Sequence, residues 1–202
     1  MLAWSIEALR AVDAVTQIVV ALPQGVSEAP PGTIGVAGGE HRSQSVQAAF
    51  AAAAEDGDPV IVHDAARPLV TPAIFQAALD GLAAGDWDCA VAAAPVTDTI
   101  KRAAGGVVTD TLDRSTLWAV QTPQVFRRAA LARALSAPES VLRSATDDAW
   151  LVERQGGVVR IVPSPPENFK VTTPADLRAA ELALAADPHP DAAPSFIRGR
   201  GA

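Results

Sequence analysis

Short apolar segments alternate with helical patterns along most of the sequence, and this alternation restricts the fold more than any other feature. Five apolar runs are predicted to be strands, at residues 17–23, 59–63, 89–96, 117–126 and 158–163. Around and between these runs, apolar residues recur at helical spacing. This spacing predicts helices at 2–12 and 127–136. Strands that alternate with helices are typical of α/β folds. We therefore predict a mostly parallel, twisted sheet with helices on both faces.

Residues suited to capping mark the starts of four further predicted helices, at Ser43, Thr71, Thr146 and Thr173. A proline follows Thr71 and Thr173 directly, at the first helical position. Residues 23–39 are rich in proline and glycine and are predicted to be a loop, while residues 168–171 are predicted to be short and extended. We predict one domain over residues 1–186, and we expect residues 187–202 to form a flexible tail.

Residues 97–123 interrupt the alternation. Two polar, strand-like runs flank Gly105-Gly106, which predicts a β-hairpin. The hairpin contains little apolar material for its length, and an isolated hairpin is marginally stable in water. We therefore expect this arm to pack on something else, and a second subunit is one such surface.

Composition and charge narrow the classes of function. Of the 202 residues, 49% are hydrophobic, which is enough for a folded α/β domain, and the net charge of -7 argues against a nucleic-acid partner. No apolar run reaches about 18 residues, so no membrane association is expected. The single cysteine, Cys89, cannot form an internal disulfide, which favours a reducing, cytoplasmic location. The three histidines lack the spacing of metal ligands.

Polar side chains follow several of the predicted strands. Asp64 and Arg67 come directly after the strand that ends near His63, and Thr99, Thr122 and Lys170 lie near the ends of later extended segments. Ligands of open parallel sheets bind beyond the carboxyl ends of the strands. An acid there suits a divalent cation on phosphates, and basic side chains suit phosphate oxygens. A simpler interpretation is that Asp64 caps a turn and pairs with Arg67, but the repeated placement favours a shared site.

Seven motifs, in order, resemble the 2-C-methyl-D-erythritol 4-phosphate cytidylyltransferase family of the non-mevalonate isoprenoid pathway. The resemblance extends from Leu2 to about Leu184. The motifs are GGEHRSQSV (38–46), VHDAARP (62–68), APVTDTIKR (94–102), LDRSTLW (112–118), QTPQVF (121–126), TDDA (146–149) and NFKVTTPADL (168–177). One such motif would carry little weight, but seven in order at plausible spacings are specific.

The resemblance implies a Rossmann-like nucleotidyltransferase domain whose arm forms a homodimer. It implies an enzyme that uses CTP and Mg²⁺, transfers the cytidylyl group to 2-C-methyl-D-erythritol 4-phosphate and releases pyrophosphate. The acceptor's phosphate would attack the α-phosphate of CTP in line. Such chemistry depends on positioning and charge neutralisation more than on a covalent nucleophile.

The resemblance also assigns roles to single residues. Asp64 would serve the metal and the substrate hydroxyls, and Lys170 would hold the acceptor phosphate together with Arg114, which would reach the site of the partner subunit. The acceptor site would also be lined by Arg67, Thr99, Thr122 and Thr146. The cytosine and ribose would lie near Gly39, Glu40 and Ser45. Simpler interpretations exist for several of these: a turn at Gly39, a solvated charge at Arg114, a helix cap at Thr146.

The sequence departs from the family pattern at its start. The family begins with a strand and a glycine-rich loop that carries an arginine and, further on, a lysine for the triphosphate, and these 202 residues contain no such segment. We expect Met1 to be an internal start of a longer protein, and the 202 residues to make little cytidylyl product. Two alternatives stay open: a ribitol-5-phosphate (polyol-phosphate) cytidylyltransferase, and an inactive module that binds substrate and dimerises. The LDRSTLW motif favours the methylerythritol enzyme.

Overall fold

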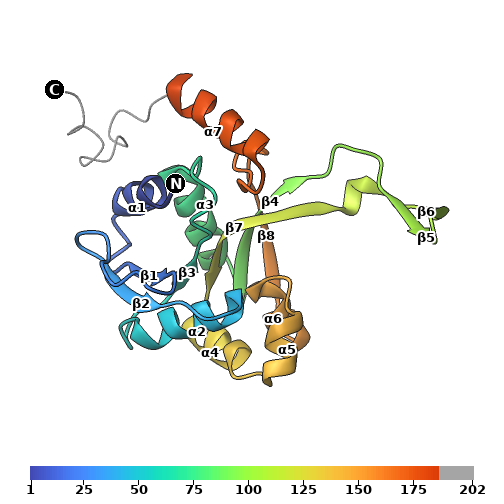
Figure 1. The fold of residues 1–202 in the computed structure, drawn as a ribbon. Coiled ribbons are helices and arrows are strands. Elements are labelled where there is room, and N and C mark those ends of the chain that lie inside the picture. Colours follow the sequence, from blue (N-terminus) through green and yellow to red (C-terminus); the bar gives the residue numbers. More distant parts are fainter. Residues whose placement is uncertain (187–202) are drawn as a thin grey trace.

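The computed structural model describes residues 1–186, which form a mixed α/β fold (Figure 1). The central sheet has the strand order β3-β7-β4-β8. Strands β3 (Val60–Val62) and β4 (Cys89–Pro95) both pair antiparallel with β7 (Trp118–Phe126), and β8 (Val159–Pro163) pairs parallel with β4. The predicted α/β class is confirmed, and within this sheet only β7 runs against its neighbours.

A second, two-stranded sheet pairs β1 (Val19–Leu22) in parallel with β2 (Ile34–Ala37). The prediction of a loop over residues 23–39 is therefore wrong for its last part. Strand β2 is short, largely exposed and surrounded by glycine and proline, so its extended form depends on pairing with β1. Residues 168–171, in contrast, form no strand.

Helices cover both faces of the central sheet, as predicted. They are α1 (Leu2–Arg10), α2 (Arg42–Ala52), α3 (Pro72–Ala83), α4 (Arg128–Leu135), α5 (Glu139–Ser144), α6 (Asp148–Arg154) and α7 (Pro174–Ala186). Side chains of β4 alternate between the two faces: Cys89 and Val91 belong to the core with α4 and α6, while Ala90 and Ala92 face the core that contains α3. Burial on both faces explains why β4 is apolar throughout.

The starts of the helices test the predicted caps. The Thr71 hydroxyl accepts a hydrogen bond from the Ile74 N–H at 3.3 Å, and Thr173 accepts one from the Asp176 N–H at 3.2 Å, so both caps are confirmed. Two other predicted caps are wrong, because α2 begins after His41 rather than Ser43, and the capping side chain of α6 is Asp147 rather than Thr146.

The arm projects from the body of the domain (Figure 1). Strands β5 (Lys101–Ala104) and β6 (Val107–Thr111) pair antiparallel around Gly105 and Gly106, which have φ of 56° and 81°. A short 3-10 helix, η1 (Arg114–Thr116), then leads into β7. The first three residues of β7 are exposed although they pair with β4, and the last six are buried in the body of the domain. The predicted hairpin is confirmed, and dimerisation through it stays a prediction.

Among residues 1–186, no helix has the length and apolar character needed to cross a membrane. The predicted tail at 187–202 lies outside the described residues.

Candidate active site

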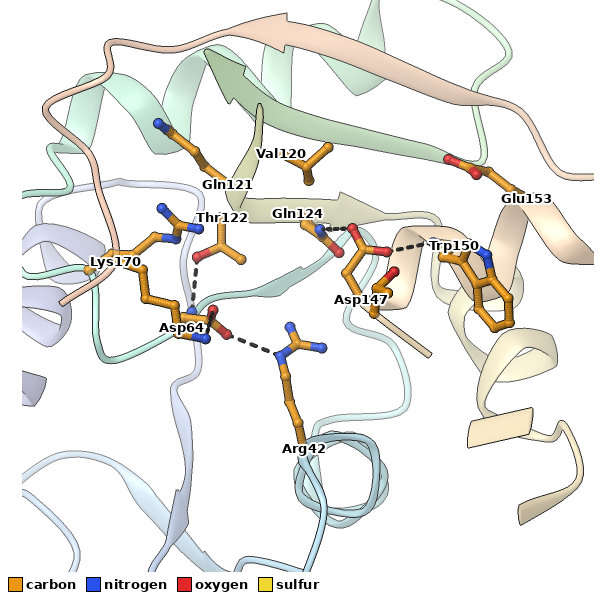
Figure 2. Close-up of a pocket in the computed structure, with 12 residues that line it drawn as sticks. Arg42, Asp64, Val120, Gln121, Thr122, Gln124, Asp147, Trp150, Glu153 and Lys170 are labelled. Atoms are coloured by element: carbon orange, nitrogen blue, oxygen red, sulfur yellow. Dashed lines mark hydrogen bonds and ion pairs between the residues drawn. The ribbon is translucent and has the colours of Figure 1, made fainter. Parts of the chain in front are cut away.

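A pocket of about 410 Å³ opens beyond the end of β3, beside the middle of β7 and the helix α6 (Figure 2). Its volume lies in the range of small-molecule sites. The lining is largely polar and charged, and consists of Arg42, Asp64, Arg67, Val120, Gln121, Thr122, Gln124, Thr146, Asp147, Trp150, Glu153 and Lys170.

Asp64 lies between two cations in this pocket. Its Oδ1 accepts a hydrogen bond from Arg42 Nε at 3.1 Å, and its Oδ2 accepts one from Lys170 Nζ at 2.9 Å (Figure 2). Burial alone would raise the pKa of Asp64, but the charges of Arg42 and Lys170 outweigh it and hold that pKa below its usual value. The local interpretation, in which the Asp64 carboxylate pairs with Arg67, is not what the structure shows, although the Arg67 N–H does close the turn onto the Asp64 carbonyl.

Arg42 joins Asp64 to a second acid from a distant part of the chain. Its Nη1 donates to Asp148 Oδ2 at 2.7 Å, and the Asp148 side chain is only 1% exposed. Burial raises the pKa of Asp148 more than Arg42 lowers it, so Arg42 is the group that makes a charged Asp148 tolerable there. One guanidinium thus ties the start of α2 to the end of β3 and the start of α6.

The backbone of Asp64 is held from the opposite side by β7. The Asp64 N–H donates to Thr122 Oγ1 at 3.0 Å, and the same oxygen lies 3.0 Å from His63 Nδ1. The His63 ring packs edge-on against Phe75, with 5.0 Å between ring centroids. Burial lowers the pKa of His63 to about 4, so the ring is neutral at pH 7. The expected packing role of His63 therefore comes with a polar contact.

Arg67 is 8% exposed and lines the pocket. Its Nη1 donates to the Asn168 carbonyl at 2.8 Å, while its Nε is buried and has no partner among residues 1–186. Asn168, 1% exposed, donates through Nδ2 to the Gln121 side chain and the Thr122 carbonyl. Asn168 therefore fixes the segment that carries Lys170 against β7.

The opposite wall is formed by β7 and the start of α6. Gln124 Nε2 donates to Asp147 Oδ2 at 2.8 Å, and the Asp147 Oδ1 accepts from the Trp150 N–H at 2.8 Å (Figure 2). The oxygen of the same Gln124 amide is also used, since it accepts from the Ala149 N–H. This wall is preorganised by hydrogen bonds that the protein makes to itself.

The structure brings together five residues that the sequence assigned to the site: Asp64, Arg67, Thr122, Thr146 and Lys170. Thr99 and Arg114 do not line this pocket. Both are exposed, and the Arg114 guanidinium donates to the Thr97 carbonyl at 2.6 Å at the base of the arm. This hydrogen bond joins Arg114 to the segment that carries Thr97 and Thr99, and both lie outside the pocket of their own chain.

The three residues assigned to the nucleotide also lie outside the pocket lining. Ser45 Oγ accepts from the Gly39 N–H at 3.1 Å, and the Gln44 side chain accepts from the Glu40 N–H at 2.9 Å. A Cβ at Gly39 would meet the Cβ of Gln44 at 2.3 Å, so only glycine fits at this position. The loop before α2 is thus fixed by side chains of α2 itself.

Sequence reasoning missed the other lining residues, which are Arg42, Val120, Gln121, Gln124, Asp147, Trp150 and Glu153. A signal for Arg42 was available, because a cation in the first turn of a helix opposes the helix dipole and needs nearby carboxylates. Gln124 gave no signal, since an amide in an apolar strand can equally face solvent.

Asp64 is a candidate ligand for Mg²⁺. The described residues contain no group of three or more side chains suited to hold a metal ion. Magnesium is commonly held by one or two carboxylates together with substrate phosphates and water. Asp64 fits that arrangement, with its oxygens at present shared by Arg42 and Lys170.

The mixed sheet covered on both faces, the charged pocket at the strand ends and the projecting hairpin define an α/β domain of the nucleotidyltransferase fold. The chain belongs to the 2-C-methyl-D-erythritol 4-phosphate cytidylyltransferase (IspD) family, whose sequence model matches residues 1–186. A solved structure of that cytidylyltransferase from Thermus thermophilus is similar with a TM-score of 0.79 and 36% identity, covering 92% of this chain and 89% of that one.

Curated relatives agree with this assignment. The 2-C-methyl-D-erythritol 4-phosphate cytidylyltransferase of Rubrobacter xylanophilus is 54% identical over 65% of this chain. A bifunctional enzyme IspD/IspF of Anaeromyxobacter dehalogenans is 44% identical over 90% of this chain. The matched regions span only 57% and 49% of these two relatives' own lengths.

Proposed function

We propose that this chain is part of an enzyme that transfers a cytidylyl group from CTP to 2-C-methyl-D-erythritol 4-phosphate and releases pyrophosphate. One observation carries the proposal: Asp64, Lys170, Arg67 and Thr122, which the family motifs assign to the acceptor site, line a single pocket. The names of the family and of the relatives support the choice of substrates.

The pocket suits the acceptor's phosphate and hydroxyl groups. Lys170 is 42% exposed, and within residues 1–186 its ammonium group donates only to Asp64, so it is the cation most easily redirected to an arriving phosphate. Asp64 would then be released from Lys170 and become free to accept from the polyol hydroxyls. Mg²⁺, bound mainly by the nucleotide's phosphates with Asp64 as a protein ligand, would neutralise charge on the triphosphate.

Direct titration tests acceptor binding. We expect 2-C-methyl-D-erythritol 4-phosphate to bind this chain more tightly than ribitol 5-phosphate, and Lys170→Met to weaken that binding about tenfold or more, since it removes a hydrogen bond to a charged group. Arg143→Met, which removes an exposed cation outside the pocket, is the matched control and should bind as the parent does. Tighter binding of ribitol 5-phosphate would move the assignment to a polyol-phosphate cytidylyltransferase.

Pyrophosphate release from CTP and Mg²⁺ tests the transfer itself. We expect release to require methylerythritol phosphate. We also expect it to be slow for these 202 residues, because Arg42 and Arg67 are already hydrogen-bonded to protein groups and Lys170 would be taken by the acceptor phosphate, which leaves few donors for a triphosphate. Acceptor binding without any release would favour the alternative of a module that binds substrate only.

We further propose that the arm at 97–123 forms a homodimer. Val107 and Val108 on β6 are 69% and 55% exposed, although valine is a residue that is usually buried. In such a dimer Arg114, with the Thr99 segment to which it is tied, would approach the pocket of the partner subunit.

The free, buried thiol of Cys89 supports a reducing, cytoplasmic setting for the protein. We also propose that residues 1–186 form one domain.

A further inference from the structure

Arg42 binds two carboxylates through two different nitrogens. Its Nη1 donates to Asp148 Oδ2 at 2.7 Å, and its Nε donates to Asp64 Oδ1 at 3.1 Å (Figure 2). The third nitrogen, Nη2, makes no hydrogen bond within residues 1–186. The shorter of the two bonds goes to Asp148, a residue that does not line the pocket.

Asp148 holds the guanidinium more firmly than Asp64 does. The Asp148 side chain is 1% exposed, against 17% for Asp64. Hydrogen bonds are electrostatically stronger where water is excluded. Within residues 1–186, Arg42 is also the only residue that donates to the Asp148 carboxylate, whereas the Asp64 carboxylate accepts from Lys170 as well. The position of the guanidinium is therefore set by a residue outside the pocket lining.

An arginine that is not anchored in this way can bind a carboxylate differently. Its Nε and Nη2 point in the same direction and together match the two oxygens of one carboxylate, like a fork. Arg42 uses only the Nε of this fork on Asp64, and Oδ2 of Asp64 is left to Lys170. Without an anchor at Nη1, the fork would be free to close on both oxygens of Asp64.

We propose that Asp148 is a positioning residue, which holds Arg42 so that it occupies one oxygen of Asp64 and leaves the other accessible from the pocket. Arg42 fixes the Asp64 carboxylate through Oδ1, while Oδ2 accepts only from Lys170 within residues 1–186. Lys170 is half-exposed and can turn away, so Oδ2 is the oxygen that a ligand reaches.

The use of Oδ2 rests on the proposed function. The phosphate of methylerythritol phosphate would draw Lys170 to itself, and Oδ2 would then accept a hydrogen bond from a hydroxyl of the acceptor. A fork from Arg42 would occupy both oxygens of Asp64 and leave that hydroxyl without its partner. Asp148 would thus act on the ligand through two other side chains.

A crystal structure of Asp148→Asn tests the anchor without any ligand. Asparagine keeps the shape of the side chain and removes the charge that holds Nη1. We expect Arg42 to turn so that both Nε and Nη2 donate to Asp64. The domain should stay folded, because Arg42 is 33% exposed and its charge can be solvated. Asp148→Ser, with a smaller neutral side chain, is the second variant and should show the same fork. An Arg42 that keeps a single hydrogen bond to Asp64 in both variants would overturn the proposal.

Calorimetric titration of a double-mutant cycle tests the path to the ligand. Asp148→Asn should weaken binding of methylerythritol phosphate about tenfold, the effect of losing a hydrogen bond to a charged group. In an Asp64→Asn background the same change should alter binding by less than about twofold, because the carboxylate through which Asp148 acts is gone. Glu7→Gln, which removes an acid that pairs with Arg10 outside the pocket, is the control and should bind as the parent does.

Equal losses from Asp148→Asn in both backgrounds would show that Asp148 only supports the fold, which contradicts the proposal. A parent chain that does not bind the acceptor, together with a forked Arg42 in Asp148→Asn, would count against the proposed function and leave the anchoring role of Asp148 intact.

Discussion

The stability of the domain depends on one ion pair, which joins Arg42 and Asp148. Asp148 is almost fully buried, and Arg42 is the cation within reach of its carboxylate. Removing one partner of a buried pair leaves an uncompensated charge, which costs more than the pair contributes when intact. The same guanidinium orients Asp64, so the pocket and the stability of the domain depend on one residue.

Arg42→Met is expected to lower the free energy of unfolding by about 3 kcal/mol, because it strands the Asp148 charge in the interior. Adding Asp148→Asn should recover part of that loss, since the stranded charge is then gone. Arg143→Met breaks the exposed pair with Glu139 and should change stability by less than about 1 kcal/mol. Urea denaturation of the four proteins measures these differences. Similar losses for Arg42→Met and Arg143→Met would contradict the argument.

At the scale of helices and strands, two kinds of element could be predicted from the sequence. They are strands that are buried on both faces and helices that begin with a clear capping residue. The all-apolar run of β4 and the Thr-Pro starts of α3 and α7 are examples. Strand β2 and helix α5 were missed, because their own residues give weak patterns and their structure comes from neighbours. The cap of α6 was misplaced by one residue, since Thr146 and Asp147 are both good capping residues.

Helix α3 and strand β8 approach so closely that one position accepts only glycine. A Cβ at Gly81 would lie 2.4 Å from Val162 Cγ2, a stiff side chain. Gly81→Ala should therefore destabilise the domain by about 1–3 kcal/mol despite the better helix propensity of alanine. Combining it with Val162→Ala should restore part of the stability by removing the clash. Thermal unfolding is the measurement, and a stabilised single variant would refute the packing argument.

The first turn of α7 is held by an acid. The Asp176 carboxylate accepts hydrogen bonds from the Thr172 N–H, the Thr172 hydroxyl and the Thr173 N–H, and these bonds lower the pKa of Asp176 to about 2. Because the pKa of Asp176 is lower in the folded chain than its ordinary value near 3.8, the ionised carboxylate stabilises the fold above pH 3.8. This stabilisation is lost as the pH falls through about 2. We expect the Thr172 and Thr173 amide signals to titrate with that midpoint. In Asp176→Asn this step should vanish, and its persistence would exclude Asp176 as the cause.

At the scale of the whole molecule, the pocket is built from segments more than 100 residues apart. Lys170 meets Asp64, and Asp148 meets Arg42, through contacts that no local pattern specifies. The sequence predicted convergence at strand ends, and the structure brings five of the assigned residues to one pocket. It could not predict that Arg42 would bridge two acids, because that contact depends on where the start of α2 lies relative to the end of β3 and the start of α6. The arm residues Thr99 and Arg114 lie elsewhere, which makes the oligomeric state the decisive question.

A homodimer should form through the arm, because β6 exposes two valines that have no core within the arm to enter. Sedimentation at concentrations well above micromolar should show a dimer, and Val107→Asp combined with Val108→Asp should shift it to monomer by placing charges in the interface. Val26→Asp, at a valine that is 49% exposed in a loop outside the arm, should leave the dimer intact.

The monomeric variant should also bind methylerythritol phosphate more weakly than the parent does. The loss should be similar to that caused by Arg114→Met in the parent, since both changes remove Arg114 from the partner's pocket. A parent protein that sediments as a monomer would contradict the dimer, and an Arg114→Met variant with unchanged binding would separate the dimer from the site.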